Sequence, residues 1–257
     1  MLLSARGLCK SYRAGRGTRV LAVDDVDMDI DRGETLAVVG ESGSGKSTLG
    51  RLVLRLIEAD AGTISLDGAD VRALPRRELR LLRKDMQLIF QDPFNSLDPR
   101  YTILRSVMEP LQLHTELGGE ECADRAIELI ERVGMSSEHA LRLPRELSGG
   151  QLQRIVIARA LAVSPKLIVC DEPVAALDLS IRAQVLNLLA DLQQQMSLSY
   201  LFITHDLSTT NHLAHRIMVM RKGRVVEHGD AEAVFADPKE AYTKELVQAM
   251  PQLRRRS

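Results

Sequence analysis

The chain has 257 residues, with 34 Lys and Arg side chains against 35 Asp and Glu, which gives a formal net charge of −1. A balanced charge of this kind gives no general attraction to nucleic acid or to an anionic membrane. The composition, 45% hydrophobic and 27% charged, excludes a mainly disordered chain and predicts one large domain, or one domain that carries an insertion.

Membrane-spanning and secreted classes are not favoured either. The sequence contains no apolar run of the roughly 18 to 20 residues that cross a bilayer, and its first residues lack the pattern of a signal peptide. We therefore expect a cytoplasmic chain. Cys9, Cys122 and Cys170 have no paired spacing and are predicted to be buried, reduced thiols. With no Trp and 3% aromatic residues, the chain lacks stacking platforms for single strands, so we expect no nucleic-acid partner.

The first third of the chain is typical of strands. Apolar and acidic residues alternate over 25–31, which predicts a strand with one buried face, and a turn follows at 31–33. Residues 35–39 are apolar on both faces, like a buried central strand, and a glycine-rich loop then leads into helical spacing over 48–54. Two further strands are predicted at 62–68 and 86–90, the second of them buried.

The middle of the chain, from about 98 to 161, has a helical pattern and is predicted to be an inserted subdomain, with Gly134 ending one of its helices. Strand and helix then alternate again through a strand at 167–170, a helix at 180–195 and a strand at 200–204. Such alternation predicts a parallel sheet. A hairpin around 221–224, a helix near 241–250 and a basic end at 254–256 complete the chain.

Between the strand at 35–39 and the helix that follows it lies a phosphate-loop pattern, G-x-x-x-x-G-K-[ST]. Its glycines let backbone amides surround phosphates, Lys46 can reach the β and γ phosphates, and the Ser47 hydroxyl can ligate Mg²⁺. The alternative is a glycine-rich turn before a surface lysine, which the flanking strand and helix disfavour. The predicted ATP-binding residues here are Gly40, Glu41, Ser42, Gly43, Ser44, Gly45, Lys46, Ser47 and Thr48.

Two carboxylates, Asp171 and Glu172, follow the apolar strand at 167–170. Ligands bind at the carboxyl ends of strands in open α/β sheets, so Asp171 is expected to hold Mg²⁺, directly or through water. Glu172 is then a candidate for polarising the water that attacks the γ-phosphate. The alternative is an ordinary strand followed by an acidic helix start. Together with the phosphate loop, these residues indicate a P-loop NTPase.

The segment Leu147-Ser148-Gly149-Gly150-Gln151 narrows this class, because it resembles the signature motif of the ATP-binding cassette (ABC) family. Ser148 can cap a helix that continues to Leu161, and the start of such a helix favours a bound anion. The resemblance extends over nearly the whole chain. It implies an α/β fold: a P-loop NTPase (RecA-like) core with an antiparallel β subdomain and the inserted α-helical subdomain, within a single nucleotide-binding domain over 1–257.

The resemblance also implies roles for four more residues. Tyr12 corresponds to the aromatic residue that stacks on adenine, and Gln91 to the glutamine that reaches Mg²⁺ and the attacking water. Asp178 lies in the loop that crosses the dimer interface, and His205 corresponds to the switch histidine at the γ-phosphate. Considered singly, a Tyr such as Tyr12 is more often a packing residue, a lone His such as His205 is usually structural, and Gln91 is as readily a turn amide.

In this family two cassettes meet head to tail, which makes each ATP site composite. The resemblance implies that Lys46, Asp171, Glu172 and His205 act on the chain's own nucleotide. Ser148, Gly149, Gly150, Gln151 and Asp178 would act on that of the partner. ATP binding would close the dimer and hydrolysis reopen it.

Segments 90–100, 171–178 and 241–246 resemble the ATPase subunits of bacterial dipeptide, oligopeptide and nickel importers. The resemblance implies a second ATPase subunit, in a homodimer or a heterodimer, together with two permeases and a periplasmic or surface substrate-binding protein. It also implies a location at the cytoplasmic face of the inner membrane. Ala175 and Ala241 depart from the group's usual Ser and Pro, which affects an interface hydroxyl and a tail turn. The short tail and residues 151–154 resemble nickel-type members. Some members of the group carry an iron–sulfur cluster on C-terminal cysteines, but no cysteine follows Cys170 here, so we expect no such centre.

The expected function is therefore ATP hydrolysis that powers import of a peptide, nickel or a related small solute. A soluble ABC ATPase that acts on nucleic acid or the ribosome is an alternative, but it usually has a long coiled coil, a second cassette or basic patches. An exporter ATPase would share the same hydrolytic residues. A P-loop kinase would not account for residues 147–151 or His205. The transported substrate is not determined by these residues.

Overall fold

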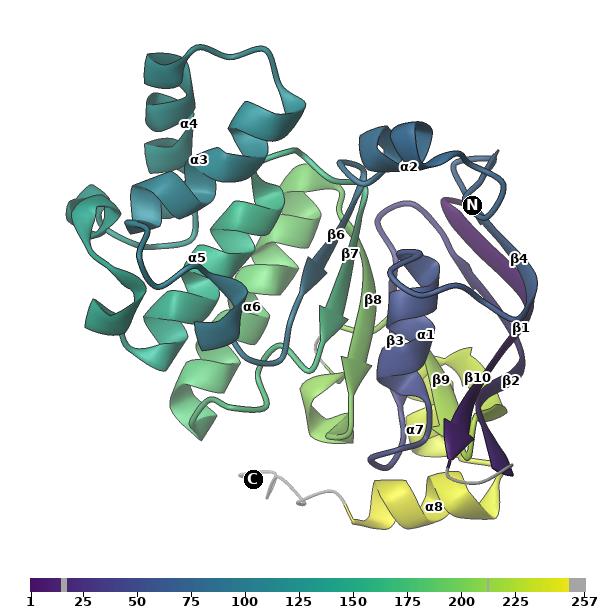
Figure 1. The fold of residues 1–257 in the computed structure, drawn as a ribbon. Coiled ribbons are helices and arrows are strands. Elements are labelled where there is room, and N and C mark those ends of the chain that lie inside the picture. The colour runs from purple at the N-terminus through teal and green to yellow at the C-terminus, as the bar shows by residue number, and fades with distance from the viewer. Residues whose placement is uncertain (15–17, 212, 250–257) are drawn as a thin grey trace, which may run out of the picture. The chain divides into compact units, whose positions relative to one another are not determined.

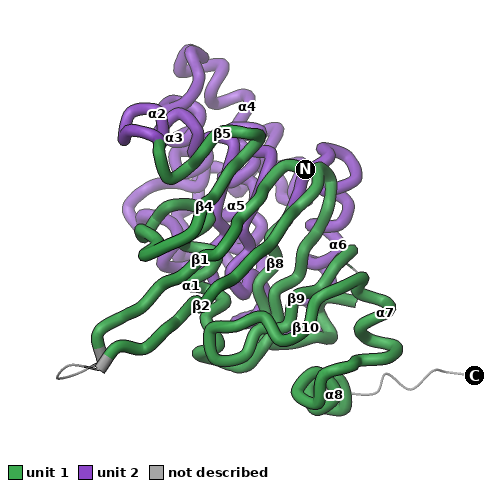
Figure 2. The backbone as a smooth tube through the Cα atoms, turned by 90° about the vertical axis from the view of Figure 1, so that its right-hand side faces the viewer, with its two compact units in different colours: residues 1–73, 200–257 green, residues 74–199 purple. Residues whose placement is uncertain are grey.

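The computed structural model describes residues 1–14, 18–211 and 213–249. The chain forms two compact units, one made of residues 1–73 with 200–257 and the other of residues 74–199 (Figures 1 and 2). The single-domain assignment over 1–257 stays a prediction. Each unit is described by itself.

The first unit begins with an antiparallel sheet in the order β2-β1-β4-β5. In β2 the apolar residues Val26, Met28 and Ile30 are buried while the acidic residues between them are wholly or partly exposed, so the predicted alternation is confirmed. This is the antiparallel subdomain that the family resemblance implied. Its strands are β1 (Leu3–Ala14), β2 (Thr18–Ile30), β4 (Ala61–Leu66) and β5 (Ala69–Asp70).

A second set of strands in this unit has the order β10-β9-β3-β8. The fully buried strand β3 (Thr35–Val39) lies parallel to β8 (Ser199–Thr204) on one side and to β9 (Arg216–Arg221) on the other. β9 and β10 (Arg224–Asp230) form the predicted hairpin through Lys222 and Gly223, both of which have positive φ, as in a type I′ turn. The remaining elements are α1 (Lys46–Val53), the 3₁₀ turn η4 (Leu207–Thr209), α7 (Ala231–Ala236) and α8 (Ala241–Gln248).

The second unit contains a parallel strand pair and most of the helices. The strands are β6 (Met86–Ile89) and β7 (Leu167–Asp171), and the 98–161 segment is helical, as predicted. The helices are α2 (Arg76–Leu82), α3 (Ile103–His114), α4 (Gly119–Arg132), α5 (Gly149–Leu161) and α6 (Leu179–Met196). Short 3₁₀ turns lie at η1 (Phe94–Ser96), η2 (Ser137–Leu141) and η3 (Pro144–Glu146).

Helix α4 shows why the inserted segment folds as helices. Its apolar residues Ala126, Leu129 and Ile130 recur at helical spacing and are buried, and the charged Glu128 between them is exposed. Gly134 has a φ of +76°, and the amides of Gly134 and Met135 donate to the last helical turn. Gly134 thus ends the helix, as predicted.

Several details differ from the sequence predictions. The strand predicted to end at Phe90 ends at Ile89, and Phe90 is 44% exposed instead of buried. Cys9 is only partly buried, whereas Cys122 and Cys170 are buried and all three are free thiols. Helix α1 begins at Lys46 and not at Thr48, because the Leu49 amide already donates a helical hydrogen bond to the carbonyl oxygen of Gly45, the last loop residue. The predicted basic end at 254–256 lies outside the described residues.

Among the described residues, no helix combines the length and the apolar character needed to span a bilayer.

Candidate nucleotide site

The phosphate loop, residues 40–45, connects the end of β3 to the start of α1 and is held against neighbouring backbone. Gly40 and Gly45 have φ values of +150° and +106°, which residues with a side chain rarely adopt. A Cβ atom would lie 2.1 Å from the Met220 carbonyl oxygen at Gly40 and 2.0 Å from the Ala22 carbonyl oxygen at Gly45. Both glycines are therefore required by close backbone contacts as well as by conformation.

Lys46 is the first residue of α1, directly after the loop, and is only 4% exposed. Its Nζ donates to the carbonyl oxygens of Gly40, at 2.7 Å, and Glu41, at 2.8 Å. The loop thus curves around the ammonium group. Helix α1 starts here with no side-chain hydrogen bond at its N-cap, Gly45, so no side chain of the cap competes with an anion for its first amides. This arrangement suits the phosphates of a nucleotide.

Residues distant in the sequence support the loop from the other side. The Gly223 amide in the β9–β10 turn donates to the Ser44 carbonyl oxygen at 2.9 Å, and the Glu41 amide donates to the Tyr242 hydroxyl at 3.0 Å. No role was predicted for Met220 or Tyr242, and Gly223 was predicted only as part of a hairpin turn. The signals in the sequence were the predicted hairpin around 221–224, which includes Gly223, and the family resemblance over 241–246, which includes Tyr242.

Tyr12 and His205 also belong to the first unit. Tyr12 lies near the end of β1 and is 44% exposed, with Lys10 Nζ 5.8 Å from the centre of its ring. An exposed ring is available to stack on a base. His205 follows β8 directly and is exposed.

In the second unit, Asp171 is the last residue of β7 and is 8% exposed. Glu172 has a φ of +51°, a left-handed conformation that is uncommon for residues other than glycine, asparagine and aspartate. Such strain persists only where the surrounding structure imposes it, and it is concentrated at functional sites. Six other described residues that are not glycine, Lys222 among them, share this conformation, so the φ of Glu172 does not by itself indicate a catalytic role.

The signature segment forms a capping box at the start of α5, which confirms the predicted cap. The Gln151 amide donates to Ser148 Oγ at 3.3 Å, and the Ser148 amide donates to Gln151 Oε1 at 3.0 Å. Gly150 is buried, and a Cβ there would lie 2.3 Å from Cγ2 of Ile181 in α6. Gly150 therefore lets α5 and α6 pack closely.

Gln91 and Asp178, the other predicted residues of this unit, lie in loops. Gln91 is exposed after β6. Asp178 is the N-cap of α6, where its Oδ1 accepts from the Ile181 amide at 3.0 Å and the Ser180 hydroxyl at 2.9 Å. These hydrogen bonds, the Ile181 amide foremost, lower the pKa of Asp178 below its ordinary value. The carboxylate thus organises the start of α6.

Comparison with known proteins gives the family. The family model described as "ABC transporter" matches residues 23–175. The glutathione import ATP-binding protein GsiA of Salmonella typhimurium is 49% identical over 97% of this chain, and GsiA of Escherichia coli K12 is 52% identical over 94%. The matches cover only 41% and 39% of those two proteins, so the chain spans less than half the length of these relatives.

Solved structures agree with this result. A dimeric ATP-binding cassette, MJ0796 bound to ADP and Pi, is 31% identical with a TM-score of 0.80, covering 90% of this chain and 99% of that one. CbiO1 of Clostridium perfringens, part of the cbiONQ transporter complex, is 29% identical with a TM-score of 0.81, covering 92% and 91%. These matches confirm the P-loop NTPase cassette fold. The chain belongs to the ABC transporter family and is one of its ATP-binding cassettes.

Proposed function

We propose that this chain is the ATP-binding and ATP-hydrolysing subunit of an ABC importer for a peptide-like solute. The observation that carries ATP binding is the phosphate loop, in which Lys46 is buried and enclosed by backbone carbonyls at the start of α1. Family membership supports the same activity.

The proposed roles of the site residues are those predicted from the motifs and the family resemblance. Lys46 and the loop amides bind the phosphates, and Tyr12 stacks on adenine. Ser47, Gln91 and Asp171 offer the hydroxyl, amide and carboxylate oxygens that Mg²⁺ prefers, so the donor set fits this ion. When bound, Mg²⁺ would neutralise developing charge on the phosphates.

Hydrolysis is assigned to Glu172 with His205. Glu172 would orient and polarise the attacking water, and His205 would contact the γ-phosphate. Glu172 directly follows β7, and ligands bind at the carboxyl ends of strands in such sheets, which supports this role. The adjoining Asp171 would hold the cation.

The working form is proposed to be a dimer of cassettes. The start of α5, residues 148–151, with Asp178, would contact the nucleotide held by the partner. An anion at the start of α5 is favoured by the helix dipole. The dimeric structure of the MJ0796 cassette supports this arrangement.

Import rests on the relatives. GsiA is named for glutathione import, which favours a small peptide over nickel as the transported solute. The proposed partners are a second cassette, two permeases and a substrate-binding protein outside the membrane, which places this chain at the cytoplasmic face of the inner membrane.

Two variants test the enzymatic part. Glu172→Gln should still bind MgATP but hydrolyse it about 10²- to 10⁴-fold more slowly, because a general base is lost. Lys46→Ala should weaken MgATP binding itself. Undiminished turnover by Glu172→Gln would remove Glu172 from its role, and normal ATP affinity of Lys46→Ala would contradict the phosphate-loop assignment.

Affinity purification of the tagged chain from gently solubilised membranes tests the transport part. Two permeases and a second cassette should be recovered. Recovery of ribosomes or DNA would favour a soluble ABC ATPase that acts on them. Recovery of permeases with no bound substrate-binding protein would favour an exporter.

A further inference from the structure

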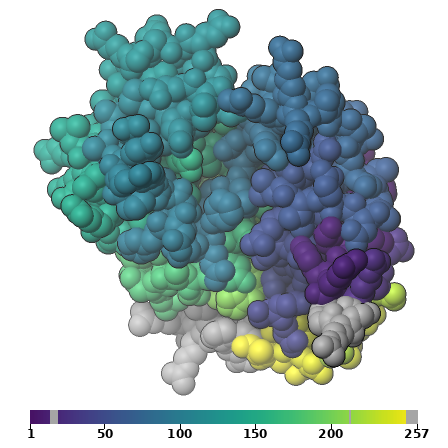
Figure 3. All heavy atoms as spheres, in the orientation of Figure 1, coloured from purple at the N-terminus to yellow at the C-terminus, as the bar shows by residue number. Residues whose placement is uncertain are grey.

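The last described helix, α8, is joined firmly to the first unit. Tyr242 and Thr243 are buried at 4% and 0% exposure, and the Tyr242 ring lies in a core cluster with Val39 and Val219. Leu246 and Val247 pack against the same cluster. Other residues of α8 are exposed, and the helix is visible at the molecular surface in Figure 3. One side of α8 therefore contacts the strand that leads into the phosphate loop.

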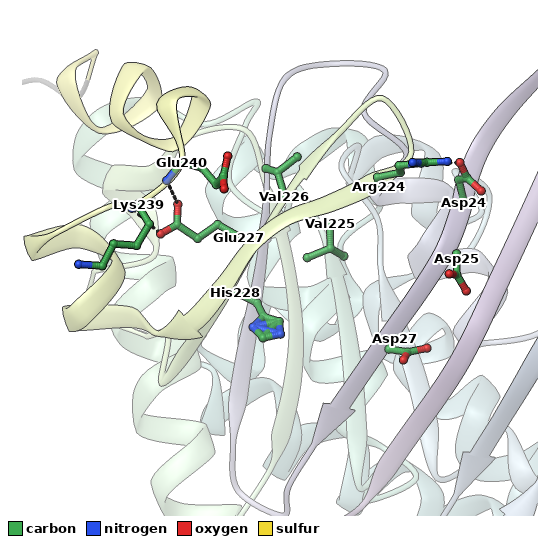
Figure 4. Close-up of a pocket in the computed structure, with 10 residues that line it drawn as sticks. All are labelled: Asp24, Asp25, Asp27, Arg224, Val225, Val226, Glu227, His228, Lys239 and Glu240. Carbon is green, nitrogen blue, oxygen red and sulfur yellow. Dashed lines mark hydrogen bonds and ion pairs between the residues drawn. The ribbon is translucent and has the colours of Figure 1, made fainter.

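The start of α8 is fixed by a carboxylate on β10. Glu227 accepts from the Lys239 amide at 2.8 Å and from the Glu240 amide at 3.1 Å (Figure 4). These are the two residues that precede the helix. Because a charged acceptor binds both amides, the first turn of α8 has a defined position relative to the β9–β10 hairpin.

The Tyr242 hydroxyl reaches the phosphate loop from this anchored helix. It accepts from the Glu41 amide at 3.0 Å, and the Arg221 guanidinium lies 4.6 Å from the centre of the ring. The ring is thus held between the core cluster and a cation. Its hydroxyl is the hydrogen-bond acceptor of one particular loop amide.

That amide adjoins the two carbonyls that hold Lys46. The Gly40 carbonyl belongs to the same peptide unit as the Glu41 amide, and it accepts from Lys46 Nζ, as does the Glu41 carbonyl. Since a peptide unit is planar and rigid, rotation of the Glu41 amide would also rotate the Gly40 carbonyl. A hydrogen bond to the Glu41 amide at one end of this unit therefore sets the position of the Gly40 carbonyl, which binds Lys46, at the other end.

We propose that Tyr242 is a positioning residue for the phosphate loop: it fixes the Gly40–Glu41 peptide, which keeps Lys46 aligned for the phosphates of ATP. This inference rests on the proposed binding of ATP at the loop. It connects the end of the described chain to nucleotide affinity.

Tyr242→Phe tests the proposal, because it removes only the hydroxyl and keeps the buried ring. Loss of one such hydrogen bond should raise the Kd for the Mg²⁺ complex of a non-hydrolysable ATP analogue, and the KM for ATP, by about 3- to 10-fold. The kcat should change by less than about twofold, because Tyr242 touches no reacting atom. Tyr101→Phe is the matched control, since that tyrosine lies in the second unit beside Arg105, and it should leave both constants unchanged.

Amide hydrogen exchange supplies a readout that simple destabilisation would not produce. Exchange at Glu41 should quicken by about 3- to 10-fold in Tyr242→Phe, while amides of the buried strand β3 keep their wild-type rates. Uniformly faster exchange through β3 would instead indicate a merely structural effect and overturn the proposal.

Unchanged affinity of Tyr242→Phe, or an equal loss in Tyr101→Phe, would also overturn it. Lys46→Ala separates this failure from failure of the proposed function. If Lys46→Ala loses the nucleotide while Tyr242→Phe does not, only the positioning role is wrong. If neither variant is affected, the phosphate-loop assignment itself fails.

Discussion

Replacement of Gly45 by alanine should both impair the phosphate loop and destabilise the protein. A Cβ at Gly45 would lie 2.0 Å from the Ala22 carbonyl oxygen, whereas real Cβ contacts essentially never fall below 3.0 Å, so backbone must move by at least about 1 Å. The φ of +106° adds about 1–3 kcal/mol of conformational strain. A displacement of about 1 Å in a catalytic site costs about 10²-fold in rate.

We therefore expect Gly45→Ala to lower kcat/KM for ATP by about 10²-fold or more. The free energy of unfolding should fall by about 2–4 kcal/mol, from strain and overpacking together. A coupled phosphate-release assay measures kcat/KM for ATP, and urea denaturation monitored by circular dichroism measures the free energy of unfolding. Both can be followed in the same preparation.

Gly33→Ala is the matched control, because Gly33 also has a positive φ, +73°, but a Cβ there would meet nothing within 4 Å. It should cost about 1–2 kcal/mol of stability and leave ATP turnover unchanged. Wild-type turnover by Gly45→Ala would refute the reasoning from close packing. So would a comparable loss of turnover in Gly33→Ala, which would show that strain alone is sufficient.

Two further predictions concern packing and pH. Gly150→Ala should lower the free energy of unfolding by about 1–3 kcal/mol, because its Cβ would lie 2.3 Å from Cγ2 of Ile181. Adding Ile181→Ala to this variant should cost at least about 1 kcal/mol less than Ile181→Ala costs in the wild-type protein. Additive effects of the two substitutions in urea titrations would contradict this contact. Hydrogen bonds from the Ser11 amide, the Ser11 hydroxyl and the Lys10 ammonium lower the pKa of Asp60 to about 2. Because this folded-state pKa lies below the unfolded value, the ionised Asp60 stabilises the folded protein above about pH 4, and this stabilisation is lost as pH falls toward 2. Asp60→Asn should therefore reduce the fall of the unfolding free energy between pH 4 and 2. An unchanged slope over this range would refute the prediction.

Short-range patterns in the sequence predicted much of the fold. The alternation over 25–31, the apolar strand at 35–39 and the helical spacing of 98–161 each depend on neighbours within a few residues, and the structure confirms all three. The capping box at Ser148 is equally local, because its two hydrogen bonds join residues three apart. The phosphate loop was recognisable for the same reason.

Burial at the edges of elements was less predictable. Phe90 extends an apolar run, yet it lies beyond the last paired residue of β6 and is 44% exposed. Cys9 was expected to be buried but is only partly so, and its Sγ accepts from the Asp25 amide at 3.4 Å in a sheet interrupted by register shifts. A strand pattern does not show where pairing ends or where a bulge turns a side chain outward.

The sequence by itself determined which residues form the phosphate loop, the signature helix start and the acidic strand end, because these motifs are contiguous and their chemistry follows from residue type. Only the tertiary structure decided what holds the loop in place. The Ala22 and Met220 carbonyls that exclude side chains at Gly45 and Gly40, and the Tyr242 hydroxyl that binds Glu41, come from segments far apart along the chain. Backbone carbonyls occur in every residue, and one tyrosine hydroxyl has no local pattern, so chain folding alone brings these groups to the loop.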